Sequence, residues 1–352
     1  MDKIRLMKGN EAIAEAAIRA GADAYFGYPI TPQSEILEYL AEQNPAKTTG
    51  MVVLQAESEI AAINMVYGAA CAGRRVMTSS SGPGISLMTE GISYLAGAEL
   101  PCLIVNISRG GPGLGTIQPS QADYFQTTKG GGHGDYRMLV LAPSSVQEMA
   151  DFVALGFELA FKYRNPVMML SDGVIGQMME KVELPDYQPR KQEYESWATI
   201  GKPTDREHNI ITSLNLDALI HERHNHKLQA KYRRMEEEET RSEMFFCDDA
   251  EYIVVAYGAS ARISRKAVDL AREQGFKAGL FRPITLFPFP AKELKAAAKN
   301  VKGLLSVEMN AGQMIEDVRL AVDCRIPVKH FGRYGGVIHA PGEILESLKF
   351  EV

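Results

Sequence analysis

The chain has 352 residues, of which 45% are hydrophobic and 23% are charged, and it carries a formal net charge of −6 with an isoelectric point of about 5.8. This size and composition are typical of a globular protein with two domains. The acidic balance argues against a nucleic-acid-binding surface, and no apolar run reaches the roughly 20 residues that span a bilayer. We expect a cytoplasmic protein that binds small molecules and other proteins, with no nucleic acid and no membrane.

The cysteines exclude two kinds of metal centre. Cys71, Cys102, Cys247 and Cys324 lie far apart, with no Cys-x-x-Cys pair. Iron–sulfur clusters and structural zinc sites are built from clustered thiolates. We therefore expect neither on this chain.

Residues 1–182 alternate between helix and strand patterns. Apolar positions recur at helical spacing over residues 10–20, and a short strand is predicted at 24–26. The apolar runs at 101–107, 139–141 and 166–170 are of the continuous kind found in buried parallel strands. The pattern predicts an α/β fold with an open, mostly parallel sheet.

The first predicted strand leads into the turn Tyr28-Pro29-Ile30-Thr31-Pro32. Two prolines hold this backbone extended, and a helix is expected to begin just after it. Thr31 or Ser34 is a candidate cap for that helix. A purely structural role for Thr31 is therefore an open alternative.

Residues 53–84 read as strand, helix, strand and loop, with two carboxylates, Glu57 and Glu59, where the helix begins. The helix dipole favours an anion at that end, whereas burial favours the neutral acid. A carboxyl group under such opposed influences is a site candidate. The competing interpretation is that both glutamates are solvated charges at a helix N-terminus.

Two loops at strand ends are rich in glycine. Residues 79–84 combine serines and glycines but lack both the Gly-Lys-Ser/Thr ending and the GxGxxG spacing of phosphate loops. Arg109 follows a buried strand and opens the long loop 110–135, at the edge where open parallel sheets bind ligands. This loop is a candidate substrate or partner loop, and His133 within it is either ligand-facing or solvated.

Composition changes after residue 182. Residues 183–249 are charged and contain His221, His224 and His226, but lysines and arginines nearby oppose cation binding, so a charged helical connector is favoured over a metal site. From residue 250 to 352 a second α/β pattern follows, with strands at 252–257, 278–281 and 303–308. We predict a second, smaller domain there.

The whole chain resembles the alpha subunit of the 2-oxoacid:ferredoxin oxidoreductases, which are thiamine-diphosphate enzymes that convert 2-oxoacids to acyl-coenzyme A. The resemblance rests on the turn at 28–32, the Glu59 helix running to Gly68, the loop 78–84, Arg109, and the segments from Gly258 and at 282–288. It implies a thiamine-diphosphate pyrimidine-binding domain followed by a transketolase C-terminal-like domain, both open and mostly parallel.

The resemblance also implies roles for single residues. Glu59, matched by its spacing to Gly68, would hydrogen-bond the aminopyrimidine ring nitrogen and favour the imino form that takes the thiazolium proton. Thr31 would donate to the keto oxygen of the substrate, and Arg109 would bind its carboxylate. The pyrimidine would be lined by Tyr28, Pro29, Ser81 and Gly82.

The sequence lacks the motif that would bind the diphosphate half of the cofactor. The family binds the diphosphate through magnesium with a Gly-Asp-Gly motif, and the nearest match here, Ser171-Asp172-Gly173, lies in the wrong half. The resemblance therefore implies a beta subunit that binds thiamine diphosphate and Mg²⁺, a gamma subunit, a ferredoxin-like subunit with 4Fe–4S clusters, and ferredoxin as partners. Coenzyme A would be a co-substrate.

The loop after Arg109 resembles that of the branched-chain type, which acts on 3-methyl-2-oxobutanoate. No cationic residue follows Arg109 closely enough to hold a second carboxylate, and Lys129 is the only further lysine or arginine in the loop. An apolar substrate tail is favoured, with 2-oxoglutarate and pyruvate as alternatives. A thiamine enzyme with another acceptor and a non-catalytic assembly subunit are the rival classes.

Overall fold

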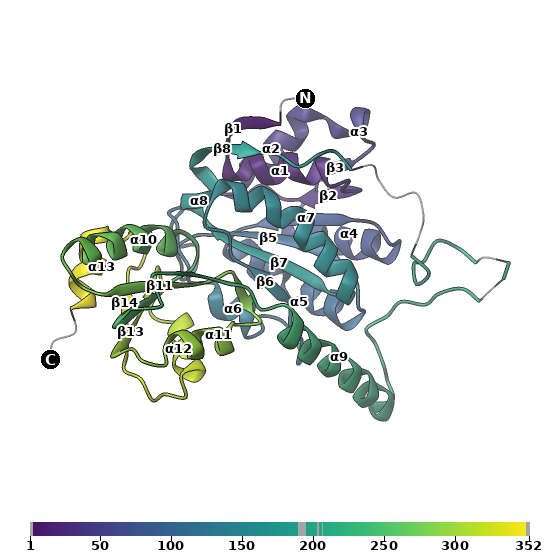
Figure 1. Ribbon diagram of the computed structural model, residues 1–352. Helices are drawn as coiled ribbons and strands as arrows, with labels where there is room; N and C mark the ends of the chain where they lie inside the picture. Colours follow the sequence, from purple (N-terminus) through teal and green to yellow (C-terminus); the bar gives the residue numbers. More distant parts are fainter. Residues whose placement is uncertain (1–2, 189–194, 203, 206, 350–352) are drawn as a thin grey trace.

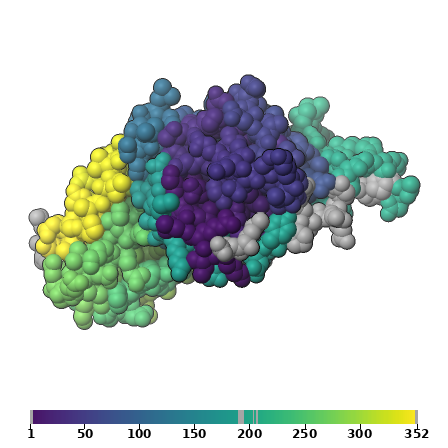
Figure 2. Space-filling view, turned by 90° about the horizontal axis from the view of Figure 1, so that it is seen from above, coloured from purple at the N-terminus to yellow at the C-terminus, as the bar shows by residue number. Residues whose placement is uncertain are grey.

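A computed structural model describes residues 3–188, 195–202, 204–205 and 207–349 (Figure 1). The chain forms two α/β units, as the sequence predicts, with the C-terminal unit at one end of the N-terminal unit (Figure 2). No described helix is long and apolar enough to cross a membrane.

The larger sheet has seven strands in the order β12-β6-β7-β5-β4-β2-β3. Neighbouring strands are parallel except β12, which runs antiparallel to β6. The strands are β2 (Ala24–Gly27), β3 (Val52–Gln55), β4 (Val76–Ser80), β5 (Cys102–Ser108), β6 (Leu139–Leu141), β7 (Pro166–Asp172) and β12 (Thr285–Phe287).

Helices cover this sheet, with α7 packed on β5 and β7, and α4 packed on β2 and β4. The helices of this unit are α1 (Gly9–Arg19), α2 (Ser34–Gln43), α3 (Pro45–Thr48), α4 (Glu59–Cys71), α5 (Pro83–Gly97), α6 (Tyr124–Thr128), α7 (Val146–Tyr163) and α8 (Gly173–Gln177). A separate antiparallel pair consists of β1 (Ile4–Lys8) and β8 (Met179–Glu183).

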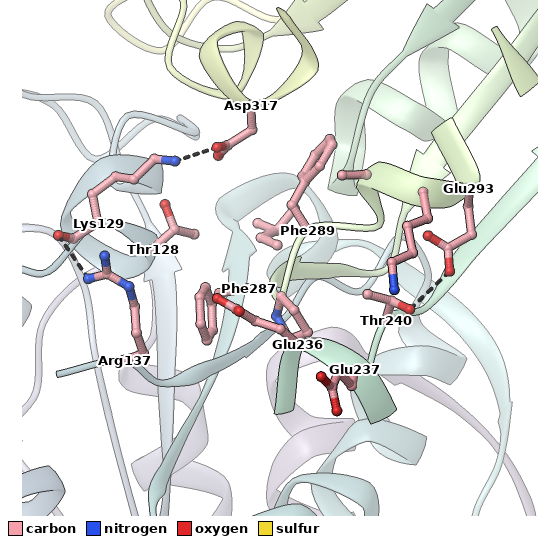
Figure 3. A pocket seen from close by; sticks show the side chains of 14 residues that line it. Thr128, Lys129, Arg137, Glu236, Glu237, Thr240, Phe287, Phe289, Glu293 and Asp317 are labelled. Atoms are coloured by element: carbon pink, nitrogen blue, oxygen red, sulfur yellow. Dashed lines mark hydrogen bonds and ion pairs between the residues drawn. The ribbon is translucent and has the colours of Figure 1, made fainter. Parts of the chain in front are cut away.

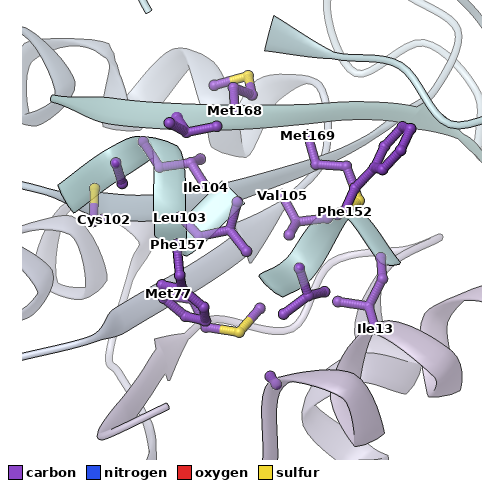
Figure 4. Packing of buried hydrophobic residues seen from close by; sticks show 14 of the residues in the cluster. Ile13, Met77, Cys102, Leu103, Ile104, Val105, Phe152, Phe157, Met168 and Met169 are labelled. Carbon is purple, nitrogen blue, oxygen red and sulfur yellow. The ribbon is translucent and has the colours of Figure 1, made fainter. Parts of the chain in front are cut away.

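The core lies where β5 and β7 meet α7 (Figure 4). Every residue of both strands is buried, which explains their continuous apolar runs. Gly156 of α7 lies directly over Leu103, and a Cβ at that glycine would stand 2.7 Å from a Leu103 methyl carbon. The close approach of α7 to the sheet therefore requires glycine at this position.

The second sheet has the order β14-β13-β10-β11-β9, parallel except for β9. Its strands are β9 (Ser242–Phe245), β10 (Tyr252–Val255), β11 (Ala278–Pro283), β13 (Gly303–Glu308) and β14 (Val328–Gly332), and its helices are α10 (Gly258–Glu273), α11 (Ala291–Ala297), α12 (Met314–Ala321) and α13 (Pro341–Leu348). Since β12 follows β11 in the chain but joins the first sheet, the C-terminal part of the chain contributes one strand to the first sheet. The domain limits at residues 182 and 249 stay predictions.

The charged segment between the units contains α9 (Ala218–Glu238), which packs on the first unit. Leu228, Tyr232 and Met235 are buried on one side of it. On its edge, Lys231 pairs with Glu99 at 3.4 Å, and the Tyr163 hydroxyl donates to Glu238 at 2.7 Å. Before α9, described residues 195–202 and 207–216 form a long connection (Figure 1), in which Ala198 is buried and the Thr199 N–H donates to the Cys71 carbonyl of α4 at 2.8 Å.

Candidate active site

The carboxyl ends of the parallel strands bring the predicted site residues to one edge of the first sheet. Tyr28 and Pro29 follow β2, Ser81 and Gly82 follow β4, and Arg109 follows β5. Ligands bind at this edge in open α/β sheets, because the loops that leave the strands there diverge and leave a crevice.

Glu59 begins α4, and the two neighbouring glutamates have different environments. Ser58 is the N-cap, and its hydroxyl accepts a hydrogen bond from the Ala61 backbone N–H at 3.1 Å. Glu59 is only 6% exposed, whereas Glu57 is exposed. The competing interpretation, that Glu57 and Glu59 are both solvated helix-end charges, is therefore wrong for Glu59.

The Glu59 carboxyl group faces the loop that follows β4. A Cβ at Gly84 would stand 2.6 Å from Glu59 Oε1 and 2.1 Å from Ser80 Oγ, so glycine leaves the space that the carboxyl group borders. Thr78, Ser80 and Ser81 each have a buried hydroxyl without a hydrogen-bond partner. Such groups are costly to bury unless a ligand or water satisfies them, so these hydroxyls suit a polar ligand.

A chain of hydrogen bonds that starts at the buried Tyr25 side chain holds the turn at residues 28–32 in place. The Tyr25 hydroxyl lies 2.7 Å from Ser79 Oγ, which donates to Gln33 Oε1 at 2.6 Å. Gln33 Nε2 in turn donates to the Tyr28 carbonyl at 2.9 Å. Sequence reasoning missed Gln33, whose burial beneath the turn has no sequence signal. Neither Thr31 nor Ser34 caps α2, because its N-cap is Gln33 without a side-chain cap.

Arg109 joins the two loops that flank the pocket. Its Nη1 donates to the Thr31 carbonyl at 2.9 Å, and its Nη2 donates to the Leu114 carbonyl at 3.1 Å. A Cβ at Gly82 would stand 3.4 Å from Arg109 Cγ, so this side chain lies against the loop after β4. The guanidinium is thus fixed by two backbone carbonyls and keeps further N–H donors for an anion.

Arg109 lines a cavity of about 670 Å³ between the two units. Asp123 also lines it and accepts a hydrogen bond from Asn106 Nδ2 at 2.9 Å. Burial raises the pKa of Asp123, although Asn106, Ser108 and Arg109 oppose that shift. The sequence pointed to none of these neighbours of Arg109, because Asp123 is one polar residue among many in a long loop.

Other residues singled out in the sequence lie apart from this cavity. Asp172 caps α8 and accepts from the Ala259 backbone N–H at 3.3 Å, so it has a structural role between the units. His133 is exposed, and His224 bonds the Gly97 carbonyl at 2.7 Å. Lys129 lines a different cavity, of about 470 Å³, where it pairs with Asp317 (Figure 3).

Family models cover both units of the chain. Residues 15–244 match the pyruvate flavodoxin/ferredoxin oxidoreductase, thiamine-diphosphate-binding model, and residues 250–344 match the pyruvate:ferredoxin oxidoreductase core domain II model. The fold and site thus define a thiamine-dependent oxidoreductase component. The chain belongs to the family of 2-oxoacid:ferredoxin oxidoreductase subunits.

Full-length relatives agree with this assignment. The ketoisovalerate oxidoreductase subunit VorB of Methanothermobacter thermautotrophicus is 52% identical over 98% of this chain and 97% of its own. The 2-oxoglutarate synthase subunit KorA of the same organism is 39% identical over 97% of both chains. By sequence identity, this chain is therefore more similar to the ketoisovalerate subunit of that organism than to its 2-oxoglutarate subunit.

Solved structures have the same fold. The 2-oxoglutarate:ferredoxin oxidoreductase from Magnetococcus marinus, with 2-oxoglutarate, coenzyme A and succinyl-CoA bound, superposes with a TM-score of 0.86 at 28% identity. The match covers 99% of this chain and 65% of that one. A split-gene transketolase, with a TM-score of 0.58 and 14% identity, shares the fold alone.

Proposed function

We propose that this chain supplies the pyrimidine-side half of a thiamine diphosphate site in an enzyme that oxidatively decarboxylates 3-methyl-2-oxobutanoate. The products would be the acyl-coenzyme A and carbon dioxide, with ferredoxin as the electron acceptor. The observation that carries the proposal is the buried Glu59 carboxyl group beside Gly84 and the unpartnered hydroxyls of Thr78, Ser80 and Ser81.

Each residue has one task in this proposal. Thiamine diphosphate, when bound, would supply a carbon nucleophile for the keto carbon. Glu59 holds a proton at the pyrimidine ring nitrogen, and Ser81, Gly82, Tyr28 and Pro29 line that ring. Arg109 binds the substrate carboxylate through paired charge-assisted hydrogen bonds, and the Thr31 hydroxyl donates to the keto oxygen.

The cavity beside Arg109 supports an apolar substrate tail. Among the described residues that line it, Arg109 is the only cation, and Asp123 adds a carboxyl group. A second carboxylate, as in 2-oxoglutarate, would meet no positive charge there and would be repelled by an ionised Asp123. Lys129, the other cation of the loop, pairs with Asp317 in the separate cavity.

The surface next to the site supports a partner subunit. Helix α4 is apolar on nearly all sides, and Ile60 and Met65 are 51% and 37% exposed. Leu87 and Tyr94 of α5 are exposed as well. A helix of this kind is normally covered. We propose that the partner covering it is the cytoplasmic beta subunit with the diphosphate and Mg²⁺, in a complex that also holds the gamma and 4Fe–4S cluster subunits.

The test is coenzyme-A-dependent reduction of a low-potential dye by this chain co-expressed with its genomic neighbours. We expect a preference for 3-methyl-2-oxobutanoate over 2-oxoglutarate and pyruvate at equal concentration. A preference for 2-oxoglutarate would keep the enzyme class but overturn the proposed substrate. No reduction by a complex that contains thiamine diphosphate and clusters would favour the rival classes.

Glu59→Gln separates a catalytic from an assembly subunit. Because loss of acid–base chemistry typically costs at least 100-fold, we expect dye reduction to fall about 100-fold or more in the assembled complex. Glu57→Gln, the same change at the exposed neighbour, should leave turnover unchanged. Full turnover of the Glu59→Gln complex would support the non-catalytic alternative.

A further inference from the structure

The second unit forms one wall of the cavity beside Arg109. On the first unit, residues 109–113 line the cavity, and on the second unit residues 309–311, Gln313, Tyr334 and Gly335 line it. The sequence of the second unit contains no catalytic constellation, so no role in the site is expected from sequence alone. The structure nevertheless brings it within reach of any substrate held by Arg109.

The loop after Arg109 packs directly on the loop after β14. A Cβ at Gly336 would stand 2.2 Å from Gln118 Cβ, and this glycine has a φ of +96°. A Cβ at Gly110 would stand 3.3 Å from the Gly335 carbonyl carbon. These contacts leave no room for side chains, so the position of one loop determines the position of the other.

The loop after Arg109 is also fixed within itself. The Gly110 backbone N–H donates to the Gln118 carbonyl at 2.9 Å, and Thr116 N–H donates to the Gly110 carbonyl at 2.8 Å. At its tip, the Leu114 carbonyl accepts from Arg109 Nη2. The second unit therefore touches a compact loop that itself holds the guanidinium.

Among the described residues that line this cavity, the one aromatic side chain is Tyr334, which is 60% exposed. It sits beside Gly335, at the point where the second unit meets the loop after Arg109. A 2-oxoacid whose carboxylate bound Arg109 would share this cavity with the Tyr334 ring, because both residues line it. An aromatic ring is a suitable wall for an aliphatic tail, because it offers a large apolar surface with few rotatable bonds.

We propose that Tyr334 is a specificity-determining residue, whose ring forms the wall that recognises the side chain of the 2-oxoacid bound at Arg109. Gly336 is the positioning residue that lets this wall approach the Arg109 loop. The inference rests on the proposed function, and it assigns the second unit a part in substrate selection. The wall formed by the Tyr334 ring fits a substrate tail that is branched and aliphatic.

Tyr334→Ala tests the inference in the co-expressed complex, with kcat/KM measured for 3-methyl-2-oxobutanoate and for pyruvate. We expect the ratio of the two values to fall about tenfold, since losing contact with one or two methyl groups typically costs this much. Tyr334→Phe keeps the ring and should keep the ratio. Tyr187→Ala removes a tyrosine of similar exposure, 51%, that lines another cavity, and should also leave the ratio unchanged.

The outcomes separate this inference from the proposed function. An unchanged ratio in an active Tyr334→Ala complex overturns the inference alone. If none of the 2-oxoacids tested supports dye reduction by the unaltered complex, the proposed function fails and the inference fails with it. If Tyr334→Ala does not assemble, Tyr334→Trp replaces it, because the larger ring must narrow the cavity and lower the same ratio.

Gly336→Ala tests the positioning role. The new Cβ would displace the Arg109 loop, so we expect KM to rise several-fold for all three 2-oxoacids together. Gly275→Ala is the control, because Gly275 has a φ of +78° but no atom within 4 Å of its Cβ position. Equal KM values in the two variants would show that the loop contact does not position Arg109. They would overturn the positioning role of Gly336.

Discussion

Gly84 lets the Glu59 carboxyl group pack against the start of α5. It follows Pro83 at the start of α5, where many residues would be accepted by a helix N-terminus. The space at its Cβ position is bordered instead by Glu59 Oε1 and Ser80 Oγ. At this residue the requirement comes from the pocket, because the helix itself accepts other residues.

Gly84→Ala is therefore expected to damage the site more than the fold. The methyl group would displace the Glu59 carboxyl group, and displacements of this kind can cost about 100-fold in rate. Dye reduction and thiamine diphosphate content of the assembled complex would measure the effect. Gly342→Ala is the matched control, since Gly342 also follows a proline at a helix start but has no atom within 4 Å of its Cβ position. Equal activity of the two variants would contradict this description of the pocket.

Asp172 is a second residue whose environment makes a measurable prediction. Burial raises its pKa from 3.8 to about 6, although three backbone N–H groups oppose that shift. The folded state thus binds the proton more tightly than the unfolded state. The stability that Asp172 contributes is fully present below pH 4 and is lost as pH rises to about 6.

Asp172→Asn removes this pH dependence while keeping a side chain that can cap α8. The stability of the unaltered chain relative to the variant should fall by about 2 kcal/mol between pH 4 and pH 7. Urea unfolding at both pH values measures the difference. Asp217→Asn, the same change at the exposed N-cap of α9, is the control. A difference that is constant with pH would contradict the buried, protonated Asp172.

At the scale of elements, the sequence predicts central elements well and edge elements poorly. β5 and β7 have continuous apolar runs because both faces are buried, and the Glu59 helix begins at the predicted residue. β9 and β14 were missed because they are edge strands, partly exposed and with charged residues in their short sequences. β12 was missed because its partner β6 lies more than 140 residues away in the chain.

The same distinction applies to the site. Glu59, Ser81, Gly82 and Arg109 follow strand ends, where sequence pattern and topology together indicate ligand binding. Asp123 and Tyr334 lie in loops, and their place beside Arg109 depends on how the two units pack. Packing between distant segments has no local sequence signal, so sequence reasoning could not reach either residue.

Helix α9 illustrates how a polar element is held against a sheet. Glu99 pairs with Lys227 and Lys231, and the Lys231 side chain is only 11% exposed. Burial lowers the pKa of Lys231 to about 8 despite the opposing effect of Glu99. The lysine therefore depends on this carboxylate to remain charged.

Glu99→Gln should destabilise the docking of α9. It leaves the buried Lys231 ammonium without an anion, a change that typically costs about 3 kcal/mol. Thermal unfolding of the isolated chain measures the loss. Glu251→Gln makes the same change in the exposed pair with Lys302 and should leave the midpoint almost unchanged. If both variants melt alike, the buried pair does not hold α9 in place.

On the scale of the whole molecule, the proposed recognition of the substrate would depend on the relative position of the two units. Arg109 and Tyr334 line one cavity from different units, so a small rotation between the units would change the distance from the proposed carboxylate site to the proposed tail site. Arg282, only 4% exposed, joins them by pairing with Glu148 of α7. A more central connection lies beside the cavity itself, at Gln121.

Gln121 is 2% exposed and bonds the second unit through its side chain and its backbone. Its Oε1 accepts from Ser260 Oγ at 2.8 Å and from the Met309 N–H at 3.0 Å, and its Nε2 donates to the Tyr257 carbonyl at 2.9 Å. Met309 also lines the cavity beside Arg109. One amide side chain thus connects α10 and the cavity wall to the loop that leads from Arg109.

Gln121→Leu nearly keeps the size of the side chain but removes these three buried hydrogen bonds, while the Tyr257 carbonyl keeps its bond from the Ala261 N–H. At about 1 kcal/mol or more for each, we expect a loss of about 3 kcal/mol in the free energy of unfolding. Hydrogen exchange should speed up at the start of α10 and at residue 309, and KM for the 2-oxoacid should rise because the cavity wall is no longer fixed. Gln229→Leu removes one partly exposed hydrogen bond to Asp135 and is the control. If Gln121→Leu lost stability with an unchanged KM, the two units would be joined for folding alone, and the cavity wall would be fixed by the contact of Gly336 with Gln118.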